Sequence, residues 1–433
     1  MRSLYRRAAT LGLIGTALIG LTAGAVAPTF AASGTSVSTA TTVSTATVFP
    51  PLDPTALRSA IQTQPADGTS GAIARVGEPG QLWQGSTVDS QTGRKIPENG
   101  HFHIGSISKV FETTVLLQLA AEGRVDLDRT VQYYMPGLLP DTFQPITLRE
   151  LVNYTSGLPN VDEGKPAESV DETIANRYDY RTFDEIIQTT LRPADRPWPG
   201  PHFAPGSKQE YNSLGFRIAG KLIEQITGHS FKEEVTERIL KPLQLKQTTV
   251  PEDDPVMPRP YLHGYVTDSQ GKAVDVSEQG GDPSNMISTP ENLDRFISAL
   301  FQGRLLPAAQ LNEMFTLPKD NEGKLVPFIG SNCNKVACFG AGLMSTPLPD
   351  GGVLWGKTGH DLGYANGVFA TRDLSIRAVY SVSNMSLDFG APTPLANRLL
   401  TAVLTPRPRT AEGSGGTVAA RPLRVALVDG NSR

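Results

Sequence analysis

The chain has 433 residues, of which 39% are hydrophobic, and a net charge of −4. This length is enough for a domain with a sizeable core. A small acidic excess gives no reason to expect a nucleic-acid partner, because such proteins carry clustered basic charge.

Residues 1–31 have the composition of an export signal. Three arginines precede an apolar run from Ala8 to Ala27, and small residues up to Ala31 offer a cleavage site. The run approaches the length of a membrane span, but its Gly, Ala and Thr content favours a removable signal. We therefore expect a secreted protein without a stable membrane anchor, and the adjacent arginines leave the export route open. Removal of the segment takes away three arginines and no acidic residue, so the net charge falls from −4 to −7.

Two further segments have too little bulky apolar content to build a core. Residues 32–50 are almost entirely Ser, Thr, Ala, Val and Gly and are typical of a flexible linker. The tail, 406–433, is rich in Arg, Pro, Gly and Thr, and we expect it to be disordered or removed. The folded domain is therefore predicted to span residues 51–405.

Strand-like segments lie near both ends of this domain. Residues 71–76 and 81–85 have strand character near its start, and 353–356, 364–370 and 374–383 near its end. Helical periodicity dominates the middle. We predict an α/β fold in which strands from both termini form one antiparallel sheet, flanked by helices, with a mostly helical lobe inserted between about residues 125 and 290.

A serine three residues before a lysine opens an apolar, helix-patterned run. Ser106 and Lys109 precede apolar positions that continue to Ala121, and Gly123 is a helix stop signal. Helical spacing places both side chains on one face. An amine in a desolvated pocket can accept the proton of a serine hydroxyl, which is otherwise a poor nucleophile. This S-x-x-K arrangement occurs in serine acyl transferases.

The tetrad alone is a weak signal. One is expected about once by chance in a chain of this length, and a second begins at Ser269 and ends at Lys272. The second tetrad follows Asp268 in a turn-rich stretch typical of a hairpin loop. For Ser106, an N-cap serine followed by a surface lysine is the alternative interpretation.

Two later segments add candidate residues. Tyr211 stands between a Pro-Gly loop and a helix pattern over residues 216–226. A tyrosine in such a place is usually a half-buried packing residue. Lys357, Thr358 and Gly359 follow a strand, where the lysine and threonine can donate to an anionic group and the glycine lets a substrate lie against the strand edge.

The two cysteines, Cys333 and Cys338, have four residues between them. In an exported chain this spacing predicts a small disulfide loop. A metal pair is disfavoured because no histidine or third cysteine lies nearby. His101 and His103 alternate with Phe102 as in a strand, and we predict no metal site there.

The three motifs begin at Ser106, Tyr211 and Lys357. Their order and their spacing along the chain resemble those of the penicillin-recognising serine hydrolases, which carry S-x-x-K, then Y-x-N, then K-T-G or H-T-G. The resemblance is greatest to the secreted D-Ala-D-Ala carboxypeptidases of Gram-positive bacteria, with class C beta-lactamases as near relatives. It covers roughly residues 55 to 400 and includes the stretches 118–128, 135–141, 155–158 and 219–230.

The resemblance implies a beta-lactamase/transpeptidase-like α/β fold with the site in the cleft between two lobes. It also implies that Ser106 attacks the penultimate carbonyl of a peptide ending in D-Ala-D-Ala. Lys109 and Tyr211 would share the proton transfers, with Tyr211 relaying a proton to the leaving D-alanine. Which of the two is the base stays open.

Other site residues follow from the same resemblance. The backbone N–H groups of Ser106 and His360 would form the oxyanion hole. Lys357 and Thr358 would hold the terminal carboxylate beside Gly359. No metal or organic cofactor is needed. The expected partners are peptidoglycan stem peptides or small acyl-peptides, with beta-lactams as inhibitors, and we expect a monomer.

The chain departs from the family pattern at two positions. Ser213 stands where Y-x-N has its asparagine, and Tyr154 stands where the Thr-His-Thr-Ser-Gly-Leu loop has its histidine. We expect the first change to affect the site and the second not to. Water is expected to fill the gap left by Ser213. A shift that turns Asn212 inward is disfavoured, because neighbouring side chains in an extended loop point to opposite sides and Tyr211 would turn away.

Three other functions remain compatible with the motifs. A beta-lactamase shares the acylation step and releases the acyl-enzyme faster. An esterase or D-amino-acid peptidase could use the same scaffold, because a fold does not fix the substrate. A catalytically silent receptor for muropeptides or penicillins is the non-enzymatic alternative. Covalent labelling of Ser106 by a penicillin would exclude the receptor.

Overall fold

The computed structural model describes residues 51–161, 168–193, 200–281, 283–330, 333–348, 351–387 and 393–404. The expected export signal (1–31), the linker (32–50) and the tail (406–433) lie outside these ranges. Within the described ranges, no helix combines the length and apolar character needed to cross a membrane.

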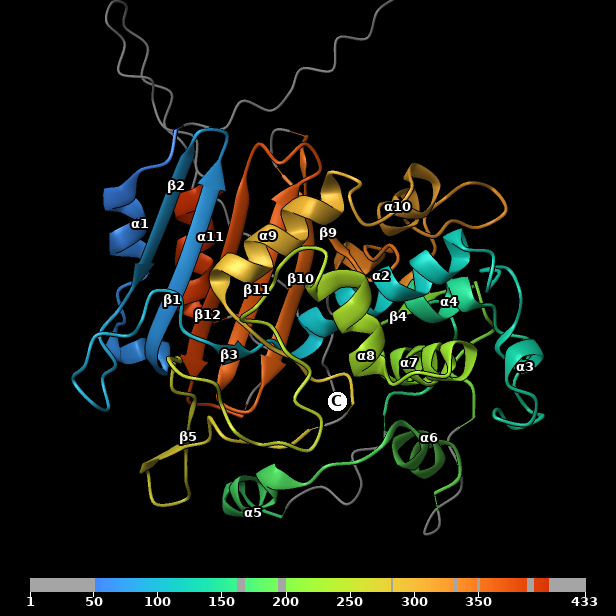
Figure 1. Cartoon of the computed structure of the whole chain (residues 1–433), viewed down its shortest axis with the longest axis horizontal. Coiled ribbons are helices and arrows are strands. Elements are labelled where there is room, and N and C mark those ends of the chain that lie inside the picture. The colour runs from blue at the N-terminus through green and yellow to red at the C-terminus, as the bar shows by residue number, and fades with distance from the viewer. Residues whose placement is uncertain are drawn as a thin grey trace, which may run out of the picture. The chain divides into compact units, whose positions relative to one another are not determined.

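A six-stranded antiparallel sheet combines strands from both ends of the chain (Figure 1). Its strand order is β2-β1-β12-β11-β10-β9. The strands are β1 (Thr69–Glu78), β2 (Gln81–Ser86), β9 (Met344–Pro347), β10 (Val353–Asp361), β11 (Tyr364–Thr371) and β12 (Arg377–Asn384). The N-terminal β1 pairs with the C-terminal β12, which confirms the predicted sheet. Strand β10 is longer than expected and contains the Lys357-Thr358-Gly359 motif within its length.

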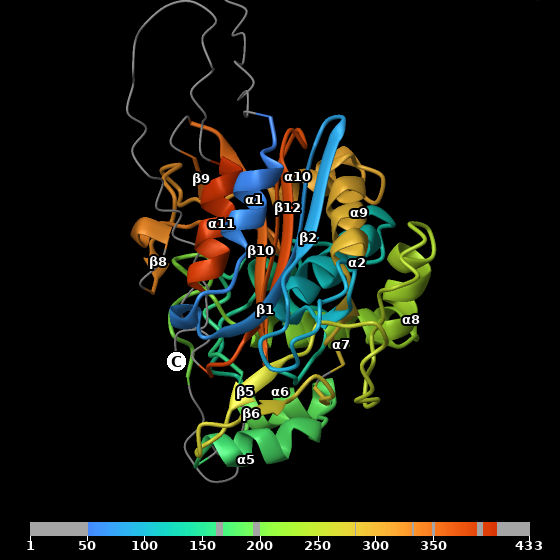
Figure 2. The ribbon, with the colours of Figure 1, turned by 90° about the vertical axis from the view of Figure 1, so that its left-hand side faces the viewer.

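Helices cover both faces of this sheet. Helices α1 (Pro54–Ala60) and α11 (Pro394–Leu404) lie on one face, and α9 (Pro290–Phe301) lies on the other (Figure 2). Asp294 of α9 fastens the helix to the sheet, because its carboxylate pairs with Arg75 of β1 at 3.0 Å and with Arg377 of β12 at 2.7 Å.

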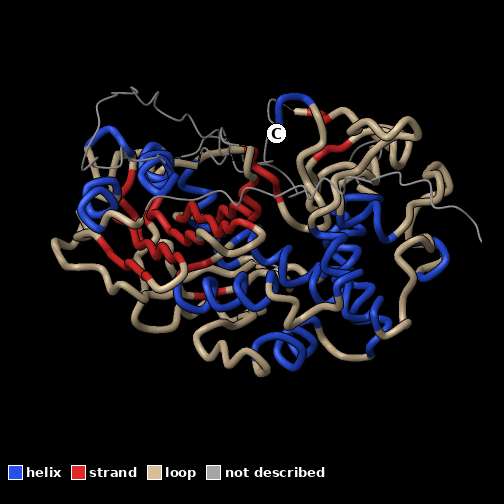
Figure 3. Tube along the Cα trace, turned by 90° about the horizontal axis from the view of Figure 1, so that it is seen from above, coloured by secondary structure: helices blue, strands red, loops and turns tan. Residues whose placement is uncertain are grey.

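The middle of the chain is mostly helical, as predicted, and lies beside the sheet (Figure 3). Its helices are α2 (Ser108–Ala121), α3 (Val131–Tyr134), α4 (Leu148–Val152), α5 (Val170–Ala175), η3 (Asn176–Tyr178), α6 (Phe183–Leu191), α7 (Leu214–Thr227), α8 (Phe231–Val235) and η4 (Thr236–Leu240). The remaining helices are η1 (Pro65–Asp67), η2 (Gly105–Ile107), α10 (Ala308–Met314) and η5 (Cys333–Lys335).

Three two-stranded ribbons complete the fold. They are β3 (Phe102–His103) with β7 (Ile287–Ser288), β4 (Gln209–Glu210) with β8 (Phe328–Ile329), and β5 (Tyr265–Thr267) with β6 (Ala273–Asp275). The second S-x-x-K tetrad lies in the turn between β5 and β6, as expected of a hairpin loop. Ser269 is exposed there and hydrogen-bonds Asp171 through its hydroxyl.

Helix α2 is the centre of the core. Eleven of its fourteen residues are buried, which is typical of a helix surrounded by protein. The ring of Phe111 stacks on that of Phe296 in α9 with a centroid distance of 3.7 Å. The turn that carries Ser106 thus leads directly into a helix that is packed on nearly all sides.

Candidate active site

Ser106 lies in η2, the short 3-10 turn that leads into α2. The turn has no side-chain cap, so Ser106 is not the N-cap residue of the alternative interpretation. Ser106 is partly exposed, whereas Lys109, one turn later, is buried. The predicted helical spacing places Lys109 Nζ 3.0 Å from Ser106 Oγ. A substrate can therefore reach the serine, while the amine stays away from bulk water.

Tyr211 reaches the same serine from the segment between β4 and α7. Its hydroxyl lies 2.8 Å from Ser106 Oγ. Ser106 Oγ thus has two proton-carrying groups, from Lys109 and Tyr211, within hydrogen-bond distance. A nucleophile flanked by groups that can take up its proton is the arrangement required for covalent catalysis.

Burial and neighbouring charges alter the acidity of both groups. Burial lowers the pKa of Lys109, and the positive charges of Arg217 and Lys357 lower it further. Burial alone would raise the pKa of Tyr211, but the ammonium groups of Lys109 and Lys357 and hydrogen bonds to Ser106 and Lys109 lower it to about 8. Both shifts make the deprotonated form that accepts the serine proton easier to reach near neutral pH.

Lys357 is buried beneath the ring of Tyr211. Its Nζ lies 4.8 Å from the centroid of that ring and donates to the backbone carbonyl of Thr358 at 2.8 Å. Thr358 is also buried, and its hydroxyl has no hydrogen-bond partner among the described residues. The motif lysine therefore acts on the electrostatics of Tyr211 in this arrangement, and the buried threonine hydroxyl stays unpaired within the part of the chain that the structure describes.

Two glycines bring the turn that carries Ser106 against strand β10. A Cβ atom on Gly105 would collide with the carbonyl oxygen of His360 and lie 2.8 Å from its nitrogen. A Cβ atom on Gly359 would collide with the carbonyl oxygen of Ile104. This close approach places the backbone of Ser106 beside that of His360, whose N–H groups are the expected oxyanion-hole donors.

The segment that departs from Y-x-N keeps Asn212 out of the site. Asn212 is buried, and its Oδ1 accepts a hydrogen bond from Gly215 N at 3.0 Å, which caps the start of α7. Ser213 is half-buried, and its backbone N–H donates to Oδ1 of Asn160 at 3.0 Å. A carboxamide from a different loop thus lies against the backbone of the third motif position, a contact that the motif itself does not indicate.

Tyr154 contacts the site, contrary to the sequence-based expectation. Its ring stacks on that of Tyr211 at 4.9 Å with an angle of 23° between the planes. Phe339 completes the cluster, 4.9 Å from Tyr154 and 5.7 Å from Tyr211. The expectation was wrong because Tyr154, with a φ of 63°, turns its side chain inward from a tight loop. Phe339 carried no motif signal that could have revealed it.

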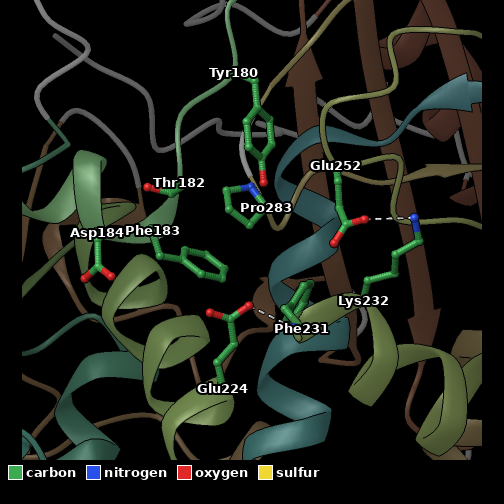
Figure 4. A pocket seen from close by; sticks show the side chains of 9 residues that line it. All are labelled: Tyr180, Thr182, Phe183, Asp184, Glu224, Phe231, Lys232, Glu252 and Pro283. Carbon is green, nitrogen blue, oxygen red and sulfur yellow. Dashed lines mark hydrogen bonds and ion pairs between the residues drawn. The ribbon is translucent and has the colours of Figure 1, made fainter. Parts of the chain in front are cut away.

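Cys333 and Cys338 form a disulfide in the segment before Phe339. Among the described residues, no group of three or more His, Cys, Asp or Glu side chains is arranged to hold a metal ion. A separate cavity of about 260 Å³ lies between α6, the C-terminal half of α7 and α8 (Figure 4). Its walls include Phe183 and Glu224 but none of the motif residues, so it is distinct from the surroundings of Ser106.

Solved structures with this architecture include a D-stereospecific amidohydrolase and a D-amino acid amidase. A D-stereospecific amidohydrolase from a Streptomyces species matches with a TM-score of 0.66 at 29% identity, over 81% of this chain and 98% of that chain. The D-amino acid amidase of Ochrobactrum anthropi SV3 matches with a TM-score of 0.65 at 26% identity, over 81% and 97% of the two chains.

Sequence comparison gives a consistent picture. A teichoic acid D-alanine hydrolase of Staphylococcus aureus is 26% identical over 221 residues, which are 50% of this chain and 50% of that protein. The chain thus spans about half the length of this curated relative. The family model described as Beta-lactamase matches residues 57–402, most of the chain. The matched range includes the segments of all three motifs, so this chain is a serine hydrolase with the beta-lactamase/transpeptidase-like fold and belongs to the Beta-lactamase family.

Proposed function

We propose that this protein is an exported, D-stereospecific serine acyl hydrolase, and that it removes the terminal D-alanine from peptides ending in D-Ala-D-Ala. The observation that carries the proposal is the position of Ser106 Oγ, 3.0 Å from Lys109 Nζ and 2.8 Å from the Tyr211 hydroxyl. The similarity to a D-stereospecific amidohydrolase and to a teichoic acid D-alanine hydrolase supports the D-configured acyl group.

The proposed reaction has two steps. Ser106 Oγ attacks the penultimate carbonyl as its proton passes to the pair formed by Lys109 and Tyr211. The carbonyl oxygen develops negative charge against the N–H groups of Ser106 and His360, each worth roughly 3 kcal/mol. The C–N bond breaks as Tyr211 returns a proton to the departing D-alanine. A water molecule then attacks the acyl ester, gives its proton to the same pair, and releases Ser106 and the shortened peptide.

The charges around the site support a substrate with a free carboxylate. The positive charges of Lys357 and Arg217 lower the pKa of Lys109, and the negative charge of Glu112 raises it. A locally cationic site stabilises an anionic substrate group. In this proposal, Lys357 and Thr358 bind the terminal carboxylate.

A D-amino-acid amidase is the second candidate, favoured by the solved structures of such enzymes that this chain resembles. The deciding experiment compares purified protein on four substrates: diacetyl-Lys-D-Ala-D-Ala, D-phenylalanine amide, a D-alanyl ester and benzylpenicillin. The L-configured counterparts of the first three and the Ser106→Ala variant are the controls. Preference for the D-Ala-D-Ala peptide supports the proposal, and preference for the amide assigns the second candidate. Equal rates for D and L substrates would exclude D-stereospecificity.

A further inference from the structure

Gln209 lies two residues before Tyr211 and is completely buried. Its Nε2 donates to the carbonyl oxygens of Asn153 and Phe339, both at 2.7 Å. Its Oε1 accepts from the N–H groups of Cys338 at 2.9 Å and Phe339 at 3.1 Å. A glutamine amide has two donor hydrogens and two acceptor lone pairs, so these bonds use its entire capacity.

The two segments that Gln209 joins carry the aromatic rings around Tyr211. Tyr154 follows Asn153, and its ring stacks on Tyr211. Phe339 lies against both of these rings. The backbone strengthens the arrangement, because Glu210 N donates to the carbonyl of Tyr154 at 2.9 Å. Gln209 therefore holds both of the rings on which Tyr211 rests.

The chemistry of this position favours a specific polar contact over simple filling of space. An apolar side chain of similar length would occupy the same volume, but it would leave buried backbone groups of three residues unpaired. A buried amide is tolerated because all of its bonds are made. Such a satisfied polar centre specifies one arrangement of the segments around it.

We propose that Gln209 is a positioning residue, which holds the Tyr211 hydroxyl in line with Ser106 Oγ through the Tyr154 and Phe339 rings. The inference rests on the proposed use of Tyr211 as a proton carrier. A misplacement of about 1 Å at a reacting group can cost about 100-fold in rate. Loss of the Gln209 amide is therefore expected to slow acylation of Ser106 without removing any group that touches a substrate.

The first test measures the rate at which a fluorophosphonate labels Ser106. In this reaction Ser106 Oγ forms a bond to phosphorus, fluoride leaves, and the hydroxyl proton passes to the Lys109–Tyr211 pair. Gln209→Met keeps the length of the side chain and removes all four hydrogen bonds, and we expect labelling to slow by about 10- to 100-fold. Gln132→Met is the matched control. Gln132 also bridges two backbone groups, those of Gln144 and Ile146, and touches none of the site segments.

The second test follows Tyr211 without any substrate. The tyrosinate absorbance of the wild type minus that of Tyr211→Phe isolates the titration of Tyr211. If Gln209 holds the ring near Lys109 and Lys357, Gln209→Met raises the pKa of Tyr211 toward its ordinary value. Gln132→Met leaves the pKa unchanged. A purely structural role would lower the melting temperature without moving this titration.

The outcomes separate this inference from the proposed function. A folded Gln209→Met variant with wild-type labelling and an unmoved titration would overturn the positioning role. If the wild type resists the fluorophosphonate but the titration moves, the proposed acyl-enzyme chemistry fails and the positioning role stands. Should Gln209→Met not fold, Gln209→Asn keeps an uncharged carboxamide that is one methylene too short to bridge both segments, and the same two measurements decide.

Discussion

Gly359 of β10 lies against the backbone of Ile104, so closely that a Cβ atom on Gly359 would collide with the Ile104 carbonyl oxygen and approach the nitrogen of Ile107 to 3.1 Å. Backbone atoms cannot move aside as a flexible side chain can. The turn that carries Ser106 and the strand that carries His360 can thus approach this closely only because residue 359 has no side chain. This contact places the turn that carries Ser106 beside His360, the expected oxyanion-hole donor.

Gly359→Ala is therefore expected to reduce acylation of Ser106 by about 100-fold or more, the scale of one lost oxyanion-hole donor. The added methyl group forces β10 away from the turn that carries Ser106. The rate of labelling by a fluorophosphonate or by a fluorescent penicillin measures the effect. Gly200→Ala is the control, because a Cβ atom on Gly200 has no neighbour within 4 Å. Wild-type labelling by Gly359→Ala would show that the backbone of His360 takes no part.

Ser106→Ala should abolish hydrolysis and covalent labelling while the protein stays folded. The serine side chain caps no helix, so its removal leaves the start of α2 intact. Ser269→Ala, in the second tetrad, is the matched control and should keep full activity. Activity assays and thermal melts of both variants check this prediction. An active Ser106→Ala together with an inactive Ser269→Ala would mean that the nucleophile lies in the other tetrad.

The sequence predicts those parts of the site that depend on local spacing. The distance from Ser106 to Lys109 follows from one helical turn, and the alternating strands near both ends predict the sheet. The aromatic cluster could not be predicted, because Tyr154 and Phe339 meet only when segments 185 residues apart fold together. The contacts of Gln209 could not be predicted for the same reason, since its partners are Asn153, Cys338 and Phe339. Tyr154 departs from the family pattern, but a sequence does not show which way a turn points its side chain.

The rate of acylation is expected to rise with pH, with a midpoint near the pKa of Tyr211 of about 8. Attack by Ser106 needs a deprotonated group that accepts the hydroxyl proton. The Lys109–Tyr211 pair provides such a group once the pair has lost a proton. The midpoint of the pH profile therefore belongs to the pair and not to one residue. Lys357→Ala removes a positive charge that lowers this pKa, so the midpoint should move to higher pH. Lys241→Ala, an exposed lysine paired with Glu237, is the control. An unmoved midpoint in Lys357→Ala would contradict the electrostatic role of Lys357.

Substrate charge provides a separate test of Lys357. If its ammonium group also binds the terminal carboxylate, Lys357→Ala should slow cleavage of an acyl-D-Ala-D-Ala peptide about 10- to 100-fold more than cleavage of the corresponding amide. This is the scale of a lost charge-assisted hydrogen bond, roughly 1.5 to 3 kcal/mol. The ratio of kcat/KM for the two substrates, in wild type and variant, gives the answer. Equal losses would restrict Lys357 to its effect on Tyr211, the ring that it faces at 4.8 Å.

The two residues after Tyr211 are expected to differ in their effects: Asn212 contributes to stability, and Ser213 affects peptide hydrolysis. The Oδ1 atom of Asn212 caps α7 through Gly215 N, so Asn212→Ala should lower the free energy of unfolding by about 0.5 to 2 kcal/mol and leave kcat/KM nearly unchanged. Ser213→Asn restores the family carboxamide at a half-buried position and should retain or improve peptide hydrolysis. Denaturant melts and steady-state kinetics on both variants test the two expectations. A loss of about 100-fold in kcat/KM for a folded Asn212→Ala, the scale of a lost charge-assisted hydrogen bond, would instead place Asn212 in the site and show that the motif is shifted by one residue.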